Sequence, residues 1–587
     1  MLVAGQDSLP ALTACHRRAV RGEPAFAWIL ACPDAAWQAQ CALLASRLAE
    51  ADADLESRTA LVQRYPLLGV PFAVKDNIDI AGQPTTAACP AFAFVPGEHA
   101  SAVQRLLAAG AVWVGKTNLD QFATGLVGTR SPHGRPASVA DGTRISGGSS
   151  SGSAVAVASG VVAFALGTDT AGSGRVPAAF NGLFGLKPTP GRVSTQGVLP
   201  ACRTLDCVSI FAHTAQDAAH VLAVVEGPDP ADAYSDFAPG PAALPALPAL
   251  RIGIPRQPDL DGAIGYDLAW AAALAKLAEA GAQTVELDFS PLYEVAALLY
   301  NGPWVAERHS VVAELLATQP EALDDTVRTV IARAVGMTAT DTFKAQYRLK
   351  AMRKSLTELW RQVDVLCVPS TPTHPTFAEV DADPVGANAR LGTYTNFVNL
   401  LGWCALAVPA GATPIGLPFG ITWIAPGGHD AALVDLVLRL APEPFSDAPL
   451  RTPATAPSLA IAVVGAHLSG LPLNGQLRER GATLAQVTQT AAAYRLFALP
   501  GTTPPKPGML RSDSGGGAIA VEVWDMPQSA VGSFLALIPP PLGLGSIELA
   551  DGRWVHGFLC EAHALAGALE ITALGGWRAY LASLPKP

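Results

Sequence analysis

The sequence predicts an α/β protein built around a large sheet, followed by a smaller C-terminal unit. Apolar runs typical of strands alternate with helical segments along most of its 587 residues, which indicates sheet and helices arranged in layers. Half of the residues are hydrophobic and 15% are charged, a composition that suits large buried cores. Because this length exceeds what one ordinary core supports, we expect one large domain and at least one smaller one.

The expected elements follow from the hydrophobic pattern in chain order. Up to about residue 60 the pattern is helical, with a Pro/Gly break at 21–24. Beyond it, we expect strands at 67–74, 111–114, 363–368, 405–408 and 419–424, and helices at 102–109, 155–162, 268–280 and 310–360.

A proline-rich segment precedes the last part of the chain. Residues 442–457 hold five prolines with Ser, Thr and Asp, which is typical of a linker, although an extended arm on the domain surface is equally consistent. A strand expected at 459–464 begins a unit of about 130 residues, enough for a core of its own. We therefore place a first domain at 1–441, a linker at 442–458 and a second domain at 459–587.

Charge and cysteine content exclude several classes of function. The net charge of -10, without a basic stretch, argues against nucleic-acid binding. The N-terminus lacks the pattern of a signal peptide, and no apolar run reaches the length of a membrane span. Nine scattered cysteines without a Cys-x-x-Cys motif favour reduced thiols in a cytoplasm over a disulfide framework or a zinc site.

A run rich in Gly and Ser occupies residues 146–153. Its composition is typical of a flexible linker, but strongly apolar sequence follows directly, and linkers do not usually lie between buried segments. No Gly-Lys-Ser/Thr ends the run, so a phosphate-binding loop is unsupported. Residues 148–152 match the Gly-x-Ser-x-Gly nucleophile elbow and nominate Ser150. That fold needs an acid and then a histidine downstream, and no histidine here has a recognisable context.

Lys75 indicates a different kind of serine nucleophile. A serine can react without histidine if a lysine takes its proton, which requires a lysine pKa lowered by burial. Lys75 ends the apolar run 67–74, where its amine would lose its water. Alone, it is more simply interpreted as a surface lysine at a strand end. What reverses that preference is the company of Ser149 and of Ser173 in a second Gly/Ser cluster at 172–174, because the three residues and their surroundings together resemble a known family.

Lys75, Ser149 and Ser173 and the residues around them resemble the amidase signature family. Its members carry a GGSS-type stretch, a GTDT-x-GS-x-R-x-P run ending near Gly-Leu-Lys-Pro-Thr, and an upstream lysine in a Val-Lys-Asp context. All of these occur here. The resemblance implies a large mixed central sheet covered by helices. It also implies that Ser173 is the nucleophile and Lys75 the terminal base, and that Ser149, at a cis peptide bond, relays the proton.

The resemblance also implies an oxyanion hole. In the family it uses backbone N–H groups just before the nucleophile, which here belong to Thr170, Ala171 and Gly172. Many members have glycine where Ala171 stands. Alanine keeps the N–H but restricts the loop, so we expect the donor to be retained in a pocket of different shape.

The run 299–308 carries the expectation about the substrate. It places Tyr300 before a Gly-Pro break and Arg308 in the following helix. An arginine facing a pocket clamps a carboxylate by two parallel hydrogen bonds, although an exposed helix arginine is the simpler interpretation of this residue alone. The run, together with residues 120–126, resembles the allophanate hydrolase branch of the family. That resemblance implies that Tyr300 and Arg308 bind the carboxylate of allophanate, the N-carboxylated form of urea, and that Gly125 shapes the pocket.

The C-terminal unit points to the same branch. Residues 463–473, 494–499 and 504–508 resemble that branch's second domain, an α+β domain with a fold similar to γ-glutamyl cyclotransferase. The resemblance implies that this domain promotes decarboxylation of the N-carboxycarbamate left after the first ammonia departs, giving two ammonia and two carbon dioxide overall. His467 is the candidate for that step, and a structural histidine at a strand end is an equal alternative.

Other functions stay open at this stage. One is an amidase for another small anionic amide such as malonamate, and another is an inactive scaffold subunit of a urea-degrading complex, against which the filled catalytic positions argue. A tRNA amidotransferase subunit would lack this C-terminal domain. The resemblance further implies a homodimer without metal or other cofactor, in the cytoplasm, with a functional link to a urea carboxylase or a cyanuric acid and biuret pathway.

Overall fold

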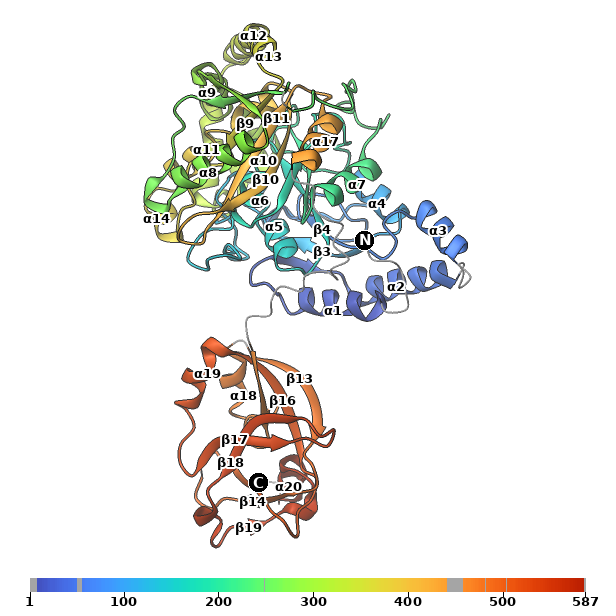
Figure 1. The fold of residues 1–587 in the computed structure, drawn as a ribbon, viewed down its shortest axis with the longest axis vertical. Coiled ribbons are helices and arrows are strands. Elements are labelled where there is room, and N and C mark those ends of the chain that lie inside the picture. The colour runs from blue at the N-terminus through green and yellow to red at the C-terminus, as the bar shows by residue number, and fades with distance from the viewer. Residues whose placement is uncertain are drawn as a thin grey trace. The chain divides into compact units, whose positions relative to one another are not determined.

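The chain forms two compact units, one within residues 1–450 and one within 451–587. The structure, a computed structural model, describes residues 8–49, 55–247, 249–440, 458–480, 482–502 and 504–584. Figure 1 draws both units. The proline-rich segment 442–457, for which a linker or an extended arm was expected, lies outside the described residues.

A large mixed sheet forms the centre of the first unit, as the sequence predicts (Figure 1). In the described part of the chain it has 11 strands in the order β1-β3-β2-β4-β6-β5-β10-β11-β9-β7-β8. Their bounds are β1 Trp28–Ala31, β2 Pro71–Lys75, β3 Val112–Thr117, β4 Phe164–Asp169, β5 Phe184–Lys187, β6 Cys207–Ala212, β7 Arg251–Pro255, β8 Gln283–Leu287, β9 Val365–Pro369, β10 Cys404–Ala412 and β11 Pro418–Ala425.

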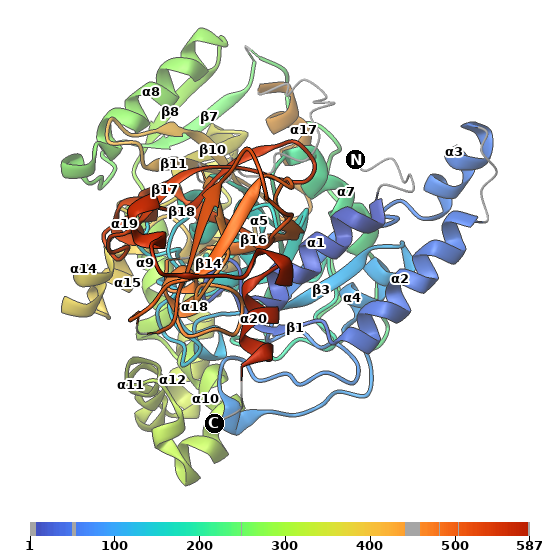
Figure 2. The same cartoon turned by 90° about the horizontal axis from the view of Figure 1, so that it is seen from below.

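Helices cover both faces of this sheet. Along β9, Val365 and Cys367 pack into one apolar cluster and Leu366 and Val368 into another, because successive side chains of a strand point to opposite faces. At one edge, α1 and α2 lie along β1 and β3 (Figure 2). The helices are α1 Ser8–Val20, α2 Asp34–Ala49, α3 Leu55–Arg64, α4 Ser101–Ala108, α5 Ser151–Ala158, α6 Val176–Phe180, α7 Ala215–Val225, α8 Tyr266–Glu279, α9 Ser290–Asn301, α10 Trp304–Thr318, α11 Asp325–Ala332, α12 Ala339–Leu356, α13 Leu359–Gln362, α14 Phe377–Ala382, α15 Gly386–Leu391, α16 Asn396–Leu400 and α17 Asp430–Leu440.

Two expected elements have different bounds in the structure. The strand expected at 67–74 begins only at Pro71, because Gly69 has a φ of +72°, which turns the chain. The helix expected at 155–162 runs from Ser151 to Ala158 and ends before Gly160, whose φ is +64°.

The pairing of β2 with β4 positions the site. These strands are parallel and adjacent, with Val74 opposite Leu166, and every residue of both is buried. The carboxyl ends of parallel neighbours meet at one edge of the sheet, where ligands bind in open α/β sheets. Lys75 and Asp169 therefore end neighbouring strands at the same edge.

The second unit is rich in strands and has its own apolar core. One described sheet has five strands, β13-β16-β12-β18-β17, and another has three, β15-β14-β19. The elements are β12 Ser458–Val463, α18 Asn474–Arg478, β13 Thr483–Gln489, β14 Tyr494–Ala498, β15 Pro507–Arg511, β16 Ala520–Pro527, α19 Gln528–Leu535, β17 Leu542–Glu548, β18 Trp554–Cys560, β19 Leu569–Glu570 and α20 Trp577–Ser583. The likeness to the γ-glutamyl cyclotransferase fold stays a prediction. In neither unit do the described residues include a helix long and apolar enough to cross a membrane.

Candidate active site

Lys75 lies completely buried at the end of β2. Its Nζ donates hydrogen bonds to Ser149 Oγ at 2.8 Å and to Thr168 Oγ1 at 2.7 Å. Loss of water lowers the pKa of this amine to about 7, against an ordinary value of 10.5, although the carboxylates of Asp120 and Asp206 oppose the shift. A buried lysine at this pKa is neutral often enough near pH 7 to accept a proton.

The two serines predicted for proton relay and nucleophilic attack lie on separate loops. Ser149 precedes α5, and its peptide bond with Gly148 is cis. Ser173 lies between β4 and α6, is 3% exposed, and its hydroxyl donates to the Gly125 carbonyl oxygen at 3.5 Å. Among the described residues, no hydrogen bond joins the two hydroxyls. The structure therefore connects Lys75 to Ser149 directly, whereas the Ser173 hydroxyl donates to Gly125 and not to Ser149.

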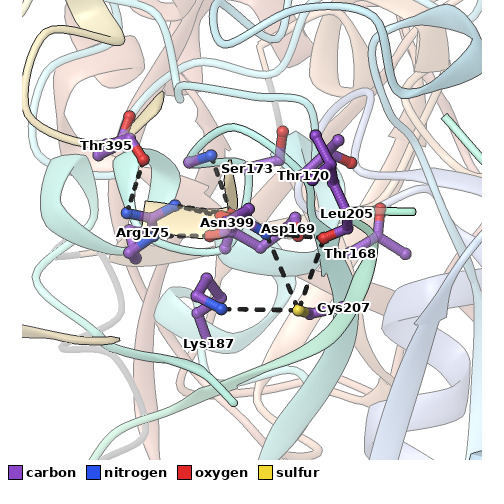
Figure 3. Close-up of polar contacts among 12 residues, drawn as sticks. Thr168, Asp169, Thr170, Ser173, Arg175, Lys187, Leu205, Cys207, Thr395 and Asn399 are labelled. Carbon is purple, nitrogen blue, oxygen red and sulfur yellow. Dashed lines mark hydrogen bonds and ion pairs between the residues drawn. The ribbon is translucent and has the colours of Figure 1, made fainter. Parts of the chain in front are cut away.

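A buried ion pair shapes the loop that carries Ser173. Arg175 donates from Nε and Nη2 to the two carboxylate oxygens of Asp169 at 2.9 and 2.8 Å, and neither side chain is exposed. The same carboxylate accepts the backbone N–H groups of Gly172 and Gly174. Figure 3 shows this pair beneath Ser173, with Asn399 donating to the Asp169 carbonyl oxygen. The loop is thus held on both sides of the serine.

The three backbone amides predicted for the oxyanion hole differ in their surroundings. The N–H of Gly172 already donates to Asp169 Oδ1 at 2.9 Å, so it can serve a substrate only by sharing. The amides of Thr170 and Ala171 make no hydrogen bond within the described residues. The Thr170 hydroxyl donates to the buried carboxyl group of Asp206, whose pKa burial raises. Asp206 therefore fixes the direction of the loop where those amides lie.

Arg308 lies on α10, and its charge acts on Lys75 in the same region of the first unit. Its side chain is buried, with an exposed fraction of 2%. Its Nη1 donates to the Ala123 carbonyl oxygen and to Thr124 Oγ1 at 3.2 and 3.1 Å, and its guanidinium lies 5.6 Å from the centre of the Tyr300 ring. The remaining groups, Nε and Nη2, are buried without a hydrogen-bond partner among the described residues.

That unpaired edge of Arg308 has the geometry that binds carboxylates elsewhere in this chain. Arg175 uses Nε and Nη2 on Asp169, and Arg251 uses the same pair of atoms on Asp364. A buried N–H without a partner is unfavourable. The free edge of Arg308 therefore indicates a site for a carboxylate.

Gly125 is required by its neighbour Asp120. A Cβ on Gly125 would come within 2.5 Å of Asp120 Oδ2, which accepts the Gly128 N–H, while Oδ1 accepts the N–H of Arg130. The backbone N–H of Asp120 in turn donates to the Ser149 carbonyl oxygen. Asp120 therefore holds the loops of Gly125 and Ser149 together.

His467 lies in the second unit, just after β12. Its Nε2 is 3.0 Å from Gln476 Oε1, and its ring stacks on Phe558 at 5.6 Å. Burial lowers the pKa of this imidazole. It lines a small cavity. These contacts suit a neutral ring held in one orientation and are compatible with either a structural or a chemical role.

Sequence reasoning missed the supporting residues of the site. Thr168 and Asp120 lie inside runs that carry the resemblance, but no role was predicted for them, and Asp206 and Asn399 lie outside those runs. Only the fold brings each of them to Lys75 or to the loop of Ser173. Within the described ranges, no group of three or more His, Cys, Asp or Glu side chains has the geometry of a metal site.

Two family models match this chain, one over its first part and one over its last part. The family model described as Amidase matches residues 31–434, and the one described as Allophanate hydrolase C-terminal domain matches residues 459–582.

Individual relatives share one or both regions. Urea amidolyase of Saccharomyces cerevisiae is 46% identical over 552 residues, which are 89% of this chain but 30% of that protein. The chain thus spans about a third of the length of such relatives. A glutamyl-tRNA(Gln) amidotransferase subunit of Deinococcus radiodurans is 36% identical over 67% of this chain and 88% of its own length. The solved structure of Kluyveromyces lactis allophanate hydrolase has a TM-score of 0.68 and 42% identity, and covers 98% of this chain and 97% of its own.

Proposed function

The chain belongs to the amidase family and has the domain architecture of amidase plus allophanate hydrolase C-terminal domain, and from this premise we propose that it hydrolyses allophanate. The reaction of the first domain converts allophanate and water to N-carboxycarbamate and ammonia. The single observation that carries the choice of substrate is the buried Arg308, whose Nε and Nη2 have no partner among the described residues.

In the proposed mechanism, neutral Lys75 accepts the proton of Ser149, which accepts that of Ser173. The Ser173 oxygen attacks the carbonyl carbon of the terminal amide, and the carbon–nitrogen bond breaks with its electron pair on nitrogen. That nitrogen takes the proton held by the relay and leaves as ammonia. Water, deprotonated by the same relay, then hydrolyses the acyl-enzyme. The 2.8 Å separation of Lys75 Nζ and Ser149 Oγ supports a proton transfer between these two groups, and the step from Ser173 to Ser149 requires the Ser173 hydroxyl to turn away from the Gly125 carbonyl oxygen.

The developing negative charge on the carbonyl oxygen needs preorganised donors. We assign this role to the amides of Thr170 and Ala171, with Gly172 contributing only if it shares its bond to Asp169. Removing one such donor typically costs about 3 kcal/mol of transition-state stabilisation. The hydrogen bond of Thr170 to Asp206 supports a fixed loop, because donors that need no reorientation stabilise charge best.

Arg308 and Tyr300 are the proposed anchors of the substrate carboxylate. A bidentate pair with Arg308 would satisfy its two unpaired N–H groups, and the Tyr300 ring beside the guanidinium limits its rotation. Gly125 contributes through its carbonyl oxygen near Ser173 and through its close fit to Asp120.

Ammonia release from allophanate tests this proposal, with malonamate, biuret and urea as competing substrates. We expect allophanate to give the highest kcat/KM and the Ser173→Ala variant to lose ammonia release. Malonamate turned over well above allophanate would favour an amidase for another anionic amide. An intact chain that reacts with none of these substrates, and with no amidase-directed covalent probe, would favour a scaffold subunit.

For the second domain we propose decarboxylation of N-carboxycarbamate, with His467 at the site. The nitrogen of the intermediate takes a proton, the bond to one carboxylate carbon breaks with its electron pair on nitrogen, and carbon dioxide leaves. The product, carbamate, then breaks down to ammonia and carbon dioxide. The place of His467 in the wall of a cavity supports this role. A His467→Ala variant that clears the intermediate as fast as the unmodified chain would leave His467 structural.

The domain limits, assembly and setting are further parts of the proposal. We place the amidase domain at 1–441, the connecting segment at 442–458 and the second domain at 459–587. We propose a homodimer in the cytoplasm, which sedimentation and cell fractionation test. Because allophanate is N-carboxylated urea, the reaction that supplies it is a urea carboxylation or the breakdown of a larger urea derivative such as biuret, and similarity to urea amidolyases supports the first.

A further inference from the structure

The second unit contains a cavity with only two ionisable side chains among the residues that line it. They are His467 and Lys506, and the other lining residues are glycine or apolar, with Leu473, Ile538 and Phe558 among them. The enclosed part of the cavity measures about 30 Å³, room for about two water-sized groups, and the rest is open to solvent. The cavity can therefore take in one end of a small ligand.

Lys506 is a cation without an internal counter-ion. It is half-buried, and among the described residues no carboxylate lies within ion-pair distance of its ammonium group. A charge held partly out of water without a partner is unfavourable. Because Lys506 lines the cavity, an anion bound there would supply the counter-ion that the described residues do not.

The backbone of Lys506 is held in place on both sides. Its N–H donates to Thr502 Oγ1 at 2.9 Å, and its carbonyl oxygen accepts the Leu499 N–H at 3.1 Å. The next residue, Pro507, packs so closely on the segment after β12 that a Cβ on Gly465 would come within 2.4 Å of its ring. Lys506 is therefore fixed beside the segment that carries His467.

His467 presents one nitrogen that its structural contacts do not use. Its Nε2 is engaged by Gln476 Oε1, whereas Nδ1 has no hydrogen bond within the described part of the chain. Because Gln476 Oε1 can only accept, Nε2 carries the proton of the neutral ring, and Nδ1 accepts a hydrogen bond from a ligand or, once the imidazole is protonated, donates a proton to it.

We propose that this cavity binds a small carboxylate or carbamate anion, with the ammonium of Lys506 as its counter-ion and His467 facing the atom that takes the proton. The inference rests on the decarboxylation proposed above and names Lys506 as its anion-binding residue. The ligand of that chemistry is N-carboxycarbamate, which carries two carboxylate groups. Lys506 would hold the carboxylate that is kept, while the apolar wall favours the other as neutral carbon dioxide over its charged form.

The experiment follows ¹³C-labelled allophanate by NMR in the full chain. For each variant, the rate at which the intermediate disappears is compared with the rate of first ammonia release in the same sample. We expect Lys506→Met to slow disappearance of the intermediate about tenfold or more, the scale of a lost hydrogen bond to a charged group. Lys506→Arg, which keeps the charge, should recover most of that loss.

Arg478→Met is the matched control, since Arg478 is an exposed cation of the same unit. If the intermediate disappears as fast with Lys506→Met as with Arg478→Met, but slowly with His467→Ala, the counter-ion role of Lys506 is wrong while the proposed decarboxylation stands. If His467→Ala and Lys506→Met both match the unmodified chain, the proposed decarboxylation by this unit fails as well. Far-UV circular dichroism and thermal melts show whether each variant is folded.

Binding without chemistry is tested with malonate, a stable dicarboxylate. The Arg308→Ala chain removes the proposed carboxylate site of the first domain, and the ring signals of His467 report on the second. Malonate should shift the His467 ring signals in the Arg308→Ala chain. In a chain that carries both Arg308→Ala and Lys506→Met, most of that shift should be lost. An equal shift in both chains would overturn the role of Lys506, as would no shift in either.

Discussion

The pH dependence of ammonia release tests the role of Lys75 most directly. The amine must be neutral to accept a proton, and its pKa is lowered from 10.5 to about 7 by burial. At pH 7 about half of such an amine is neutral, against about one part in 3,000 for an amine that titrates at 10.5. Below a pKa of about 7 the rate should fall about tenfold per pH unit, and above it the rate should level off.

The assay records initial rates of ammonia release, at low and at saturating allophanate, from about pH 5.5 to about pH 9. The Lys75→Met variant supplies the baseline without the base and should lose about 10²- to 10⁴-fold in kcat, the range for a general base. A rate that still climbs about tenfold per pH unit up to pH 9, as expected for a lysine with the ordinary pKa of 10.5, would refute the lowered pKa. A flat profile at low substrate, or a Lys75→Met variant with nearly full activity, would refute the role of the lysine itself.

Three further outcomes follow from the same site. Arg308→Met should weaken transition-state binding of allophanate, measured from kcat/KM, by about 2–5 kcal/mol, since it removes one partner of a buried charge pair. The kcat/KM of Arg308→Lys should lie between those of the unmodified chain and Arg308→Met, because lysine keeps the charge without the two parallel donors. Asp206→Asn should move the midpoint of the pH profile of ammonia release to lower pH, because the Asp206 carboxylate raises the pKa of Lys75. An unchanged midpoint in a folded variant would contradict this. Arg175→Met should destabilise the chain by about 3–5 kcal/mol by leaving Asp169 buried without its partner, which thermal or urea unfolding measures.

The amino-acid sequence by itself determined the class of fold and was enough to predict the reactive groups. Strands such as β9 and β11, expected at 363–368 and 419–424, lie at Val365–Pro369 and Pro418–Ala425, because a buried strand is a local apolar run. Lys75, Ser149 and Ser173 were predicted because each lies in a short motif, which can be read from adjacent residues although the three are far apart in the sequence.

Only the tertiary structure decided which distant groups serve those residues. The strand β1 at Trp28–Ala31 was not expected, because four residues in a helical region carry too little pattern. Thr168 meets Lys75 only because β4 lies beside β2, and the free edge of Arg308 depends on how α10 packs against residues 123–124. Strand order and helix packing minimise the energy of the whole core, so no local stretch of sequence specifies them.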